Sequence, residues 1–179
     1  VFIDHPKIDE YDNYLFIVFH ALFYHEKELR IATWEIDFFI GKNFLVTNHL
    51  KPISYIPDTM RKLIDGDENL VKGVDFIAQT LMHSMVDCYQ PIFKKIYNKL
   101  NEVEDEVLTD TEHDTINDIY KIKRNLAVLN KVLLPQINVL SEIMQFENKY
   151  FSPDSIVYFN DIVNTLSQTK NILNNYLEM

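Results

Sequence analysis

The side chains of this chain that are best suited to chemistry are mainly carboxylates. The first candidate is Asp87, together with His83 four positions before it. They are four positions apart in a stretch of helical periodicity, so one face of a helix presents both side chains, a spacing compatible with two ligands of a metal ion. A pair of this kind is more often a surface hydrogen bond. Taken alone, Asp87 is an oxygen ligand that suits a hard cation such as Mg²⁺.

Asp161 is the second acidic candidate, and we expect it in the first turns of the last predicted helix. A carboxylate there interacts favourably with the helix dipole, which is worth about 0.3–1 kcal/mol. The adjacent Asn160 adds an oxygen atom but no charge. The residues alone therefore favour the dipole role for Asp161 and do not make a metal site.

The third candidate is a run of carboxylates that contains no Lys or Arg. Two interpretations of this run stay open: a solvated tip between two helices, and a diffuse surface that attracts cations. Its members are Glu102, Glu104, Asp105, Glu106, Asp110, Glu112, Asp114 and Asp118.

Motifs of soluble enzymes are missing from the sequence. The three glycines, Gly41, Gly66 and Gly73, share no phosphate-binding motif, and the chain has no GxSxG, no HExxH and no pair of cysteines. We therefore expect that the protein is not an enzyme. The single cysteine, Cys88, excludes an internal disulfide and a thiolate cluster for zinc, and it indicates a reducing compartment.

Charge and hydropathy narrow the class of protein further. The 179 residues carry a formal net charge of −10, which argues against a nucleic-acid partner because phosphate binding needs clustered Lys and Arg. No stretch resembles the run of about 18–20 apolar residues that a membrane helix needs. The chain begins without Met and ends within a helical pattern, so we expect it to be a soluble piece of a longer protein.

The elements that must position the acidic residues fall into two parts. Strands over 14–24, 29–40 and 44–47, joined by short turns, predict an antiparallel meander that needs a covering layer of helices. A short helix is predicted over 57–64. Gly73 marks a boundary, so we predict an α/β region at 1–73 and a helical region at 74–179.

The helical region has apolar residues every three or four positions, first from Ile77 to Val107 and again from Ile119 to Met144. These two series predict a long antiparallel hairpin, with a kink at Pro91 and another at Pro135. Ser152-Pro153-Asp154 starts a third long helix. The predicted class is α+β: a small, partly antiparallel sheet with helices, the hairpin, and the start of a third helix.

Several ordered stretches of the chain resemble the CorA magnesium/cobalt transporter family. The run HPKIDEYDNYLFIV at 5–18 is the most similar, and 39–46, 85–91, 100–108, 121–126, 132–135 and 158–162 follow in the family's order. The similarity covers nearly the whole chain. The order of these stretches is a more specific sign of the family than any one stretch by itself.

The resemblance implies the C-terminal part of a cytoplasmic α/β domain, a helical hairpin, and a stalk helix that runs towards the membrane. It also implies a homopentamer on the cytoplasmic face of the cell membrane, reached through C-terminal helices that this chain lacks. By the same resemblance, Asp161 in the YF-x-D stretch binds a regulatory divalent cation, Mg²⁺ or Co²⁺, between subunits. Asp87, in the V-D-x-Y stretch, is a weaker candidate for the same region.

Departures from the family pattern set the remaining expectations. The carboxylate expected in an L-E-D stretch before residue 5 lies outside the chain, as do the Gly-Met-Asn pore motif and the membrane helices. Thr165 stands one turn after Asp161, where members of the family often have a histidine. We therefore expect weak Mg²⁺ binding and a monomer or weak dimer. Two alternatives stay open: a zinc transporter of the related ZntB type, and a helical module that binds a partner protein.

Overall fold

The computed structural model describes residues 4–68, 70–109, 113–146 and 149–177. Its sheet has four antiparallel strands in the order β1-β2-β3-β4, where the meander predicted three. The strands are β1 (Lys7–Glu10), β2 (Tyr14–His25), β3 (Arg30–Gly41) and β4 (Leu45–Asn48). The additional strand is β1, which sequence patterning missed because it is a four-residue edge strand, Lys-Ile-Asp-Glu, rich in charge.

Helices cover one face of this sheet. The covered face carries Leu15, Ile17 and Phe19 of β2, and each of them is fully buried. Their partners across the strand pair are Ile40, Phe38 and Ile36 of β3, which are buried as well. This alternation is what a half-buried antiparallel sheet requires, since neighbouring side chains point to opposite faces.

Two helices replace the single kinked helix that was expected from residue 74 to 107. After α1 (Tyr55–Ile64), α2 (Val74–Asp87) ends where Cys88 separates it from α3 (Tyr89–Thr109). The break lies before Pro91, not at it. Pro91 then sits in the first turn of α3, where the missing N–H has no partner to lose.

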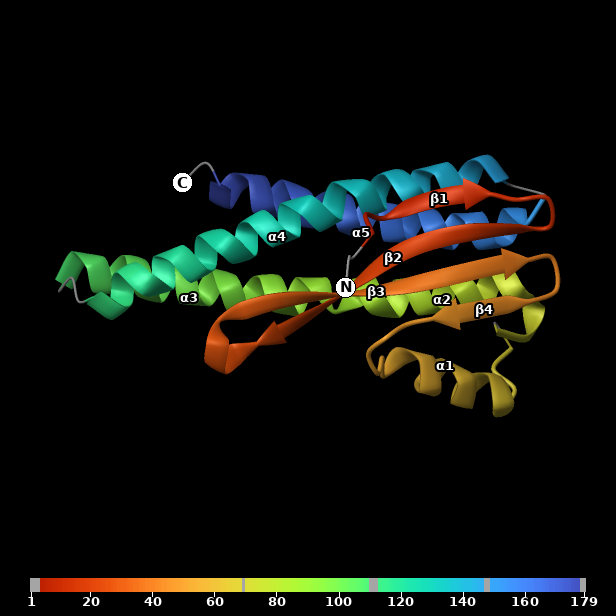
Figure 1. Cartoon of the computed structure of the whole chain (residues 1–179), viewed down its shortest axis with the longest axis horizontal. Helices are drawn as coiled ribbons and strands as arrows, with labels where there is room; N and C mark the ends of the chain where they lie inside the picture. The colour runs from red at the N-terminus through yellow and green to blue at the C-terminus, as the bar shows by residue number, and fades with distance from the viewer. Residues whose placement is uncertain (1–3, 69, 110–112, 147–148, 178–179) are drawn as a thin grey trace.

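The predicted hairpin and third helix are both present. The long helix α4 (His113–Ile143) runs back alongside α3, and α5 (Pro153–Leu177) returns antiparallel to α4 (Figure 1). Pro135 lies inside α4, and the helix continues through it. Short 3₁₀ turns occur at Glu26–Glu28, Leu70–Lys72 and Met144–Phe146.

One stretch, Thr115–Phe146, is long and apolar enough to cross a membrane by length and composition. It consists of α4 and the turn after it, which sequence inspection did not single out. Its apolar side packs against the sheet and α5, and its buried Asn125 and Gln136 hydrogen-bond to the sheet. These contacts are those of a core helix.

The buried apolar side chains form one cluster that runs from Leu15 in β2 to Leu173 in α5. It therefore includes residues on both sides of the boundary predicted at Gly73, which the structure places directly before α2. The α+β class is confirmed, and the division into two parts stays a prediction.

Candidate functional site

The carboxylate of Asp87 lies on the surface at the last residue of α2. It is 3.3 Å from His83 Nε2, and the two side chains are 62% and 41% exposed. The predicted pairing on one helix face is therefore present. The carboxyl end of a helix is the negative end of its dipole, so a carboxylate in this position gains from a nearby cation or a protonated histidine.

Asp161 is exposed on α5, and its position weakens the dipole explanation. It lies eight residues after Pro153, which is more than two turns into the helix. The dipole interaction falls off within the first turn, and Asp154 is the acidic residue that occupies that turn. The helix-dipole role that the sequence favoured for Asp161 therefore loses its physical basis.

The two helices that carry these carboxylates lie side by side and run in the same direction (Figure 1). Their amino ends are joined by Asp75, whose Oδ2 accepts hydrogen bonds from Ser152 N (2.9 Å) and Ser152 Oγ (2.7 Å). Burial alone would raise the pKa of Asp75, but these hydrogen bonds outweigh it and the net shift is downward.

Asp75 provides a contact between α2 and α5 that sequence reasoning missed. Ser152 was recognised as a helix start, but its partner is 77 positions away in the chain. Near its own backbone, Asp75 approaches Gly73 so closely that a Cβ on Gly73 would lie 2.5 Å from the carboxylate oxygen. The only hint in the sequence was therefore a glycine two residues before an acid at a helix start.

The acidic run is partly neutralised by lysines that flank it. Lys99 on α3 lies 3.5 Å from Asp118 on α4 and 3.4 Å from Glu102, and Lys121 lies 3.0 Å from Asp118. Four members of the run, Glu104, Asp110, Glu112 and Asp114, lie outside the side chains that the structure describes. For the described part, these pairs favour a solvated tip between two helices.

No three His, Cys, Asp or Glu side chains gather into a metal-binding group among the described residues. Asp87 and Asp161 are each exposed on a separate helix, and neither belongs to such a group. Chemically, each can supply one hard oxygen ligand, so within one chain a cation there would keep most of its water.

Cys88 is not a ligand in this arrangement. It follows Asp87 and accepts a hydrogen bond from the Tyr55 hydroxyl, with a distance of 2.6 Å, which ties α1 to the end of α2. Burial, together with this bond, raises the pKa of Tyr55. The thiol therefore has a structural contact close to the candidate site.

Comparisons with known proteins agree with this architecture. A family model described as "CorA-like Mg2+ transporter protein" matches residues 3–179. The putative metal ion transporter YfjQ of Bacillus subtilis is 31% identical over 97% of this chain and 53% of its own length. The cobalt/magnesium transport protein CorA of Thermotoga maritima is 26% identical over 88% of this chain and 45% of its own.

Solved structures show the same fold at lower identity. The soluble domain of CorA from Methanocaldococcus jannaschii has a TM-score of 0.84 at 19% identity, covering 97% of this chain and 69% of that one. The ZntB cytoplasmic domain from Vibrio parahaemolyticus has a TM-score of 0.78 at 13% identity, covering 98% and 68%. The chain spans about half the length of the curated relatives it matches.

Proposed function

The chain belongs to the CorA-like Mg²⁺ transporter family, and from that premise we propose that it is the cytoplasmic, cation-sensing part of a magnesium channel or transporter. The observation that carries the proposal is the extent of the family match, which includes both α2 and α5 with their exposed Asp87 and Asp161. Membership in a transporter family agrees with the expectation that the chain is not an enzyme.

Asp161 is the principal sensor ligand in this proposal, and Asp87 is the second. Carboxylates on neighbouring subunits repel each other unless a divalent cation lies between them. Bound Mg²⁺, or Co²⁺, would hold the subunits in a closed arrangement, and its loss would release them. A site with few carboxylates and several retained waters binds weakly, which suits a sensor of free cytoplasmic magnesium.

Self-association is the second part of the proposal, with a homopentamer in the complete protein. The surface of α5 around Asp161 supports it, because Val157, Tyr158 and Ile172 are exposed apolar side chains on that helix. The chain of 179 residues alone should be a monomer or a weak dimer by analytical ultracentrifugation. A stable pentamer at micromolar concentration would contradict this expectation.

Weak binding by the isolated chain can be measured by titration calorimetry with Mg²⁺. We expect no tight stoichiometric site, because Asp87 and Asp161 each provide a single carboxylate. Tight binding of one Mg²⁺ per monomer would show that the chain contains a complete site, and would contradict a site shared between subunits.

The sensor role of Asp161 can be separated from a stabilising role by two matched variants of the complete protein. Asp161→Asn should abolish the protection from limited proteolysis that millimolar Mg²⁺ gives, with little change in stability. Asp154→Asn on the same helix should lower stability by about 0.3–1 kcal/mol and keep the protection. If Asp161→Asn retains the protection of the parent protein, Asp161 is not the sensor.

A zinc transporter of the ZntB type is the second candidate, and the contact between His83 and Asp87 favours it. Imidazole nitrogen suits Zn²⁺, whereas Mg²⁺ prefers oxygen. His83→Asn should therefore remove a Zn²⁺-dependent protection and leave a Mg²⁺-dependent one intact. If only Zn²⁺ protects the complete protein, and His83→Asn abolishes that effect, the zinc transporter replaces the magnesium proposal.

A further inference from the structure

A groove runs between α1, α2 and β4, and it contains a cavity of about 300 Å³. One face of α1 lines the groove from Ile56 to Leu63, and the first half of α2 lines it from Val74 to Leu81. The third side lies within residues 43–47, which include the end of the turn before β4 and most of that strand. We call this feature the α1 groove.

Burial along α1 is the reverse of what its sequence pattern predicts. Ile56, Met60 and Leu63 repeat at helical spacing and form its apolar face. The buried residue of this helix is nevertheless Thr59, whereas Met60 is 48% exposed. On the strand side of the groove, Phe44 is 45% exposed. Within the described part of the chain, the apolar rim of the groove is therefore not covered.

The Thr59 hydroxyl is available to a bound molecule. Thr59 is 4% exposed and lines the cavity, and its hydroxyl has no hydrogen bond to the residues that the structure describes. Two other helical threonines, Thr165 and Thr169, instead donate to the carbonyl one turn earlier, at 3.0 and 2.7 Å. A buried hydroxyl without a partner is unfavourable, so a hydrogen-bonding group inside the cavity would stabilise it.

Close packing and hydrogen bonds hold the sides of the groove. Gly41 N donates to Phe44 O at 2.9 Å, and a Cβ on Gly41 would overlap the Phe44 ring, so this ring position requires glycine. At the start of α1, the Tyr55 hydroxyl donates to Cys88 Sγ at the end of α2. The α1 groove is therefore preformed, as small-molecule sites usually are.

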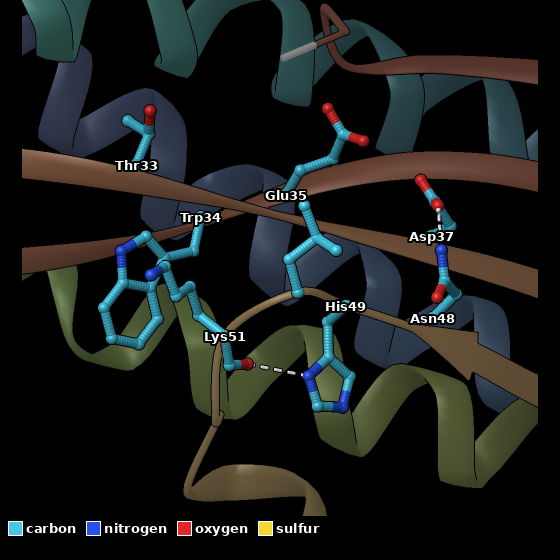
Figure 2. A pocket seen from close by; sticks show the side chains of 8 residues that line it. Thr33, Trp34, Glu35, Asp37, Asn48, His49 and Lys51 are labelled. Carbon is cyan, nitrogen blue, oxygen red and sulfur yellow. Dashed lines mark hydrogen bonds between the residues drawn. The ribbon is translucent and has the colours of Figure 1, made fainter. Parts of the chain in front are cut away.

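The lining residues determine the kind of ligand. Among the described residues, none of those that line the α1 groove is charged, and Asn43, Thr47 and Thr59 are its polar members. The cavity beside β3 is different, because Glu35 and Lys51 are among the residues that line it (Figure 2). An ion in the α1 groove would lose its water and gain no opposite charge, so the groove favours a neutral molecule.

We propose that the α1 groove binds a neutral, mainly hydrocarbon molecule whose single hydroxyl or carbonyl group hydrogen-bonds to Thr59. A water molecule fills about 30 Å³ in the liquid, so the cavity takes about ten non-hydrogen atoms. The hydrocarbon part packs on Ile77 and Leu81, and the flexible Met60 side chain adapts to its shape. The inference does not depend on cation sensing.

Photolabelling of the complete protein tests this proposal. The probe is octanol with a diazirine group on its chain, and mass spectrometry locates the labelled residues. We expect labels on the residues of α1 and α2 that line the groove, and we expect excess 1-octanol to suppress them. Octanoate has the same chain but carries a charge, so it should compete at least about tenfold less well.

The role of the Thr59 hydroxyl is tested by a variant of nearly the same shape. Thr59→Val should weaken competition by 1-octanol about threefold to tenfold, which corresponds to the loss of one neutral hydrogen bond. Thr80→Val on α2 is the control, because the Thr80 hydroxyl bonds to the Gln79 side chain and does not line the cavity. Competition by 1-octanol should be unchanged in that variant.

The position of the site is tested at the rim of the groove. Met60→Trp should remove most of the labelling, because the larger ring fills the mouth of the cavity. Ile64→Trp is the matched control, since Ile64 is a more exposed residue of the same helix, at 78%, and does not line the cavity. Both positions are exposed, so neither substitution disturbs the buried core.

Three results would overturn the proposal. Labels outside the α1 groove, or labels that excess 1-octanol does not suppress, would show that the groove is not a specific site. Octanoate competing as well as 1-octanol, or unchanged competition in Thr59→Val, would refute the stated chemistry. Labelling that appears only after everything before Val1 is deleted would show that polypeptide occupies the groove. None of these measurements depends on Mg²⁺ sensing, so the two proposals fail independently.

Discussion

The two long strands of the central hairpin differ in how their free edges are treated. On β2, beyond the end of β1, His20 N donates to Gln136 Oε1 of α4 (2.9 Å), and the Tyr89 hydroxyl donates to the His20 carbonyl (2.5 Å). On β3, beyond the end of β4, the main chain of Thr33 and Glu35 faces a cavity. The free edge of the sheet is thus capped from within the chain at His20 and open at Thr33 and Glu35.

The difference follows burial. At His20 the edge lies under α3 and α4, away from water, and an unpaired main-chain group there would be strongly unfavourable. Gln136 Nε2 also donates to the Tyr89 hydroxyl (2.6 Å), so the cap is a connected polar network. Thr33 and Glu35 are only half-buried, so water can hydrogen-bond to their main-chain groups. Of the three residues, the buried one is therefore the one that has protein partners on the free edge.

Proline substitutions at two neighbouring positions of β3 should give the largest difference in the free energy of unfolding. In the 179-residue chain, Ala32→Pro removes an N–H that faces β2 and should lower the free energy of unfolding by about 3 kcal/mol or more. Thr33→Pro removes an N–H that faces the open edge, so its cost should stay below about 1 kcal/mol. Urea denaturation measures both. Equal losses for Ala32→Pro and Thr33→Pro would mean that the β3 edge is not open.

Breaking the buried cap should have the next largest effect. Gln136→Leu leaves the His20 N–H and the Tyr89 hydroxyl without this partner, and each unsatisfied buried group costs about 1–3 kcal/mol. We expect a loss of about 2–4 kcal/mol by urea denaturation. Gln168→Leu, the same change at an exposed position of α5, is the control and should stay within about 0.5 kcal/mol.

The cap at the far end of the hairpin should matter less. Asn125 accepts from Ile31 N and donates to the Leu29 carbonyl, both at 2.8 Å. Asn125→Ala should cost about 1–2 kcal/mol, because Leu29 is only half-buried and water can satisfy its carbonyl, which leaves the Ile31 N–H as the one buried group without this partner. Asn130→Ala, exposed on the same helix, serves as control. If Asn125→Ala lowers the free energy of unfolding no more than Asn130→Ala does, the hydrogen bonds of Asn125 do not stabilise this end of the sheet.

The smallest effect concerns pH. Burial lowers the pKa of His20, partly opposed by its bond to the Asp4 carbonyl, and its Nδ1 has no partner among the described residues. Below about pH 6.5 the unfolded chain binds a proton at His20 that the folded chain does not, so stability falls as the pH decreases through that range.

Replacing His20 checks this pH dependence. His20→Leu should shrink the difference in unfolding free energy between pH 7.5 and 5.5, and His25→Leu, at the exposed end of β2, is the matched control. An unchanged pH difference in His20→Leu would show that His20 is not the group responsible.

Much of the fold was predictable because it rests on local pattern. The β-branched and aromatic runs at 14–24 and 29–40 predicted the hairpin that the structure contains, and the apolar steps from Ile119 to Met144 predicted α4. The family resemblance was confirmed over nearly the whole chain. Two local predictions were wrong: charged residues concealed β1, and the helix expected to kink at Pro91 instead breaks at Cys88.

The candidate site was less accessible to sequence reasoning. The contact between His83 and Asp87 followed from i, i+4 spacing, and the structure contains it. The metal role of Asp161 came from the resemblance, that of Asp87 from spacing as well as the resemblance, and both stay predictions. The hydrogen bonds between Asp75 and Ser152, which join α2 and α5, could not be predicted from a local sequence pattern.

The sequence by itself determined the elements, their order and the family, because hydrophobic period, turn residues and helix caps act over a few positions. Only the tertiary structure decided which main-chain groups along the free edges of the sheet are capped and which are open. The capping pairs, His20 with Gln136 and Ile31 with Asn125, are 116 and 94 positions apart. A buried main-chain group needs a partner, but where that partner lies along the chain is fixed only when the helices pack on the sheet.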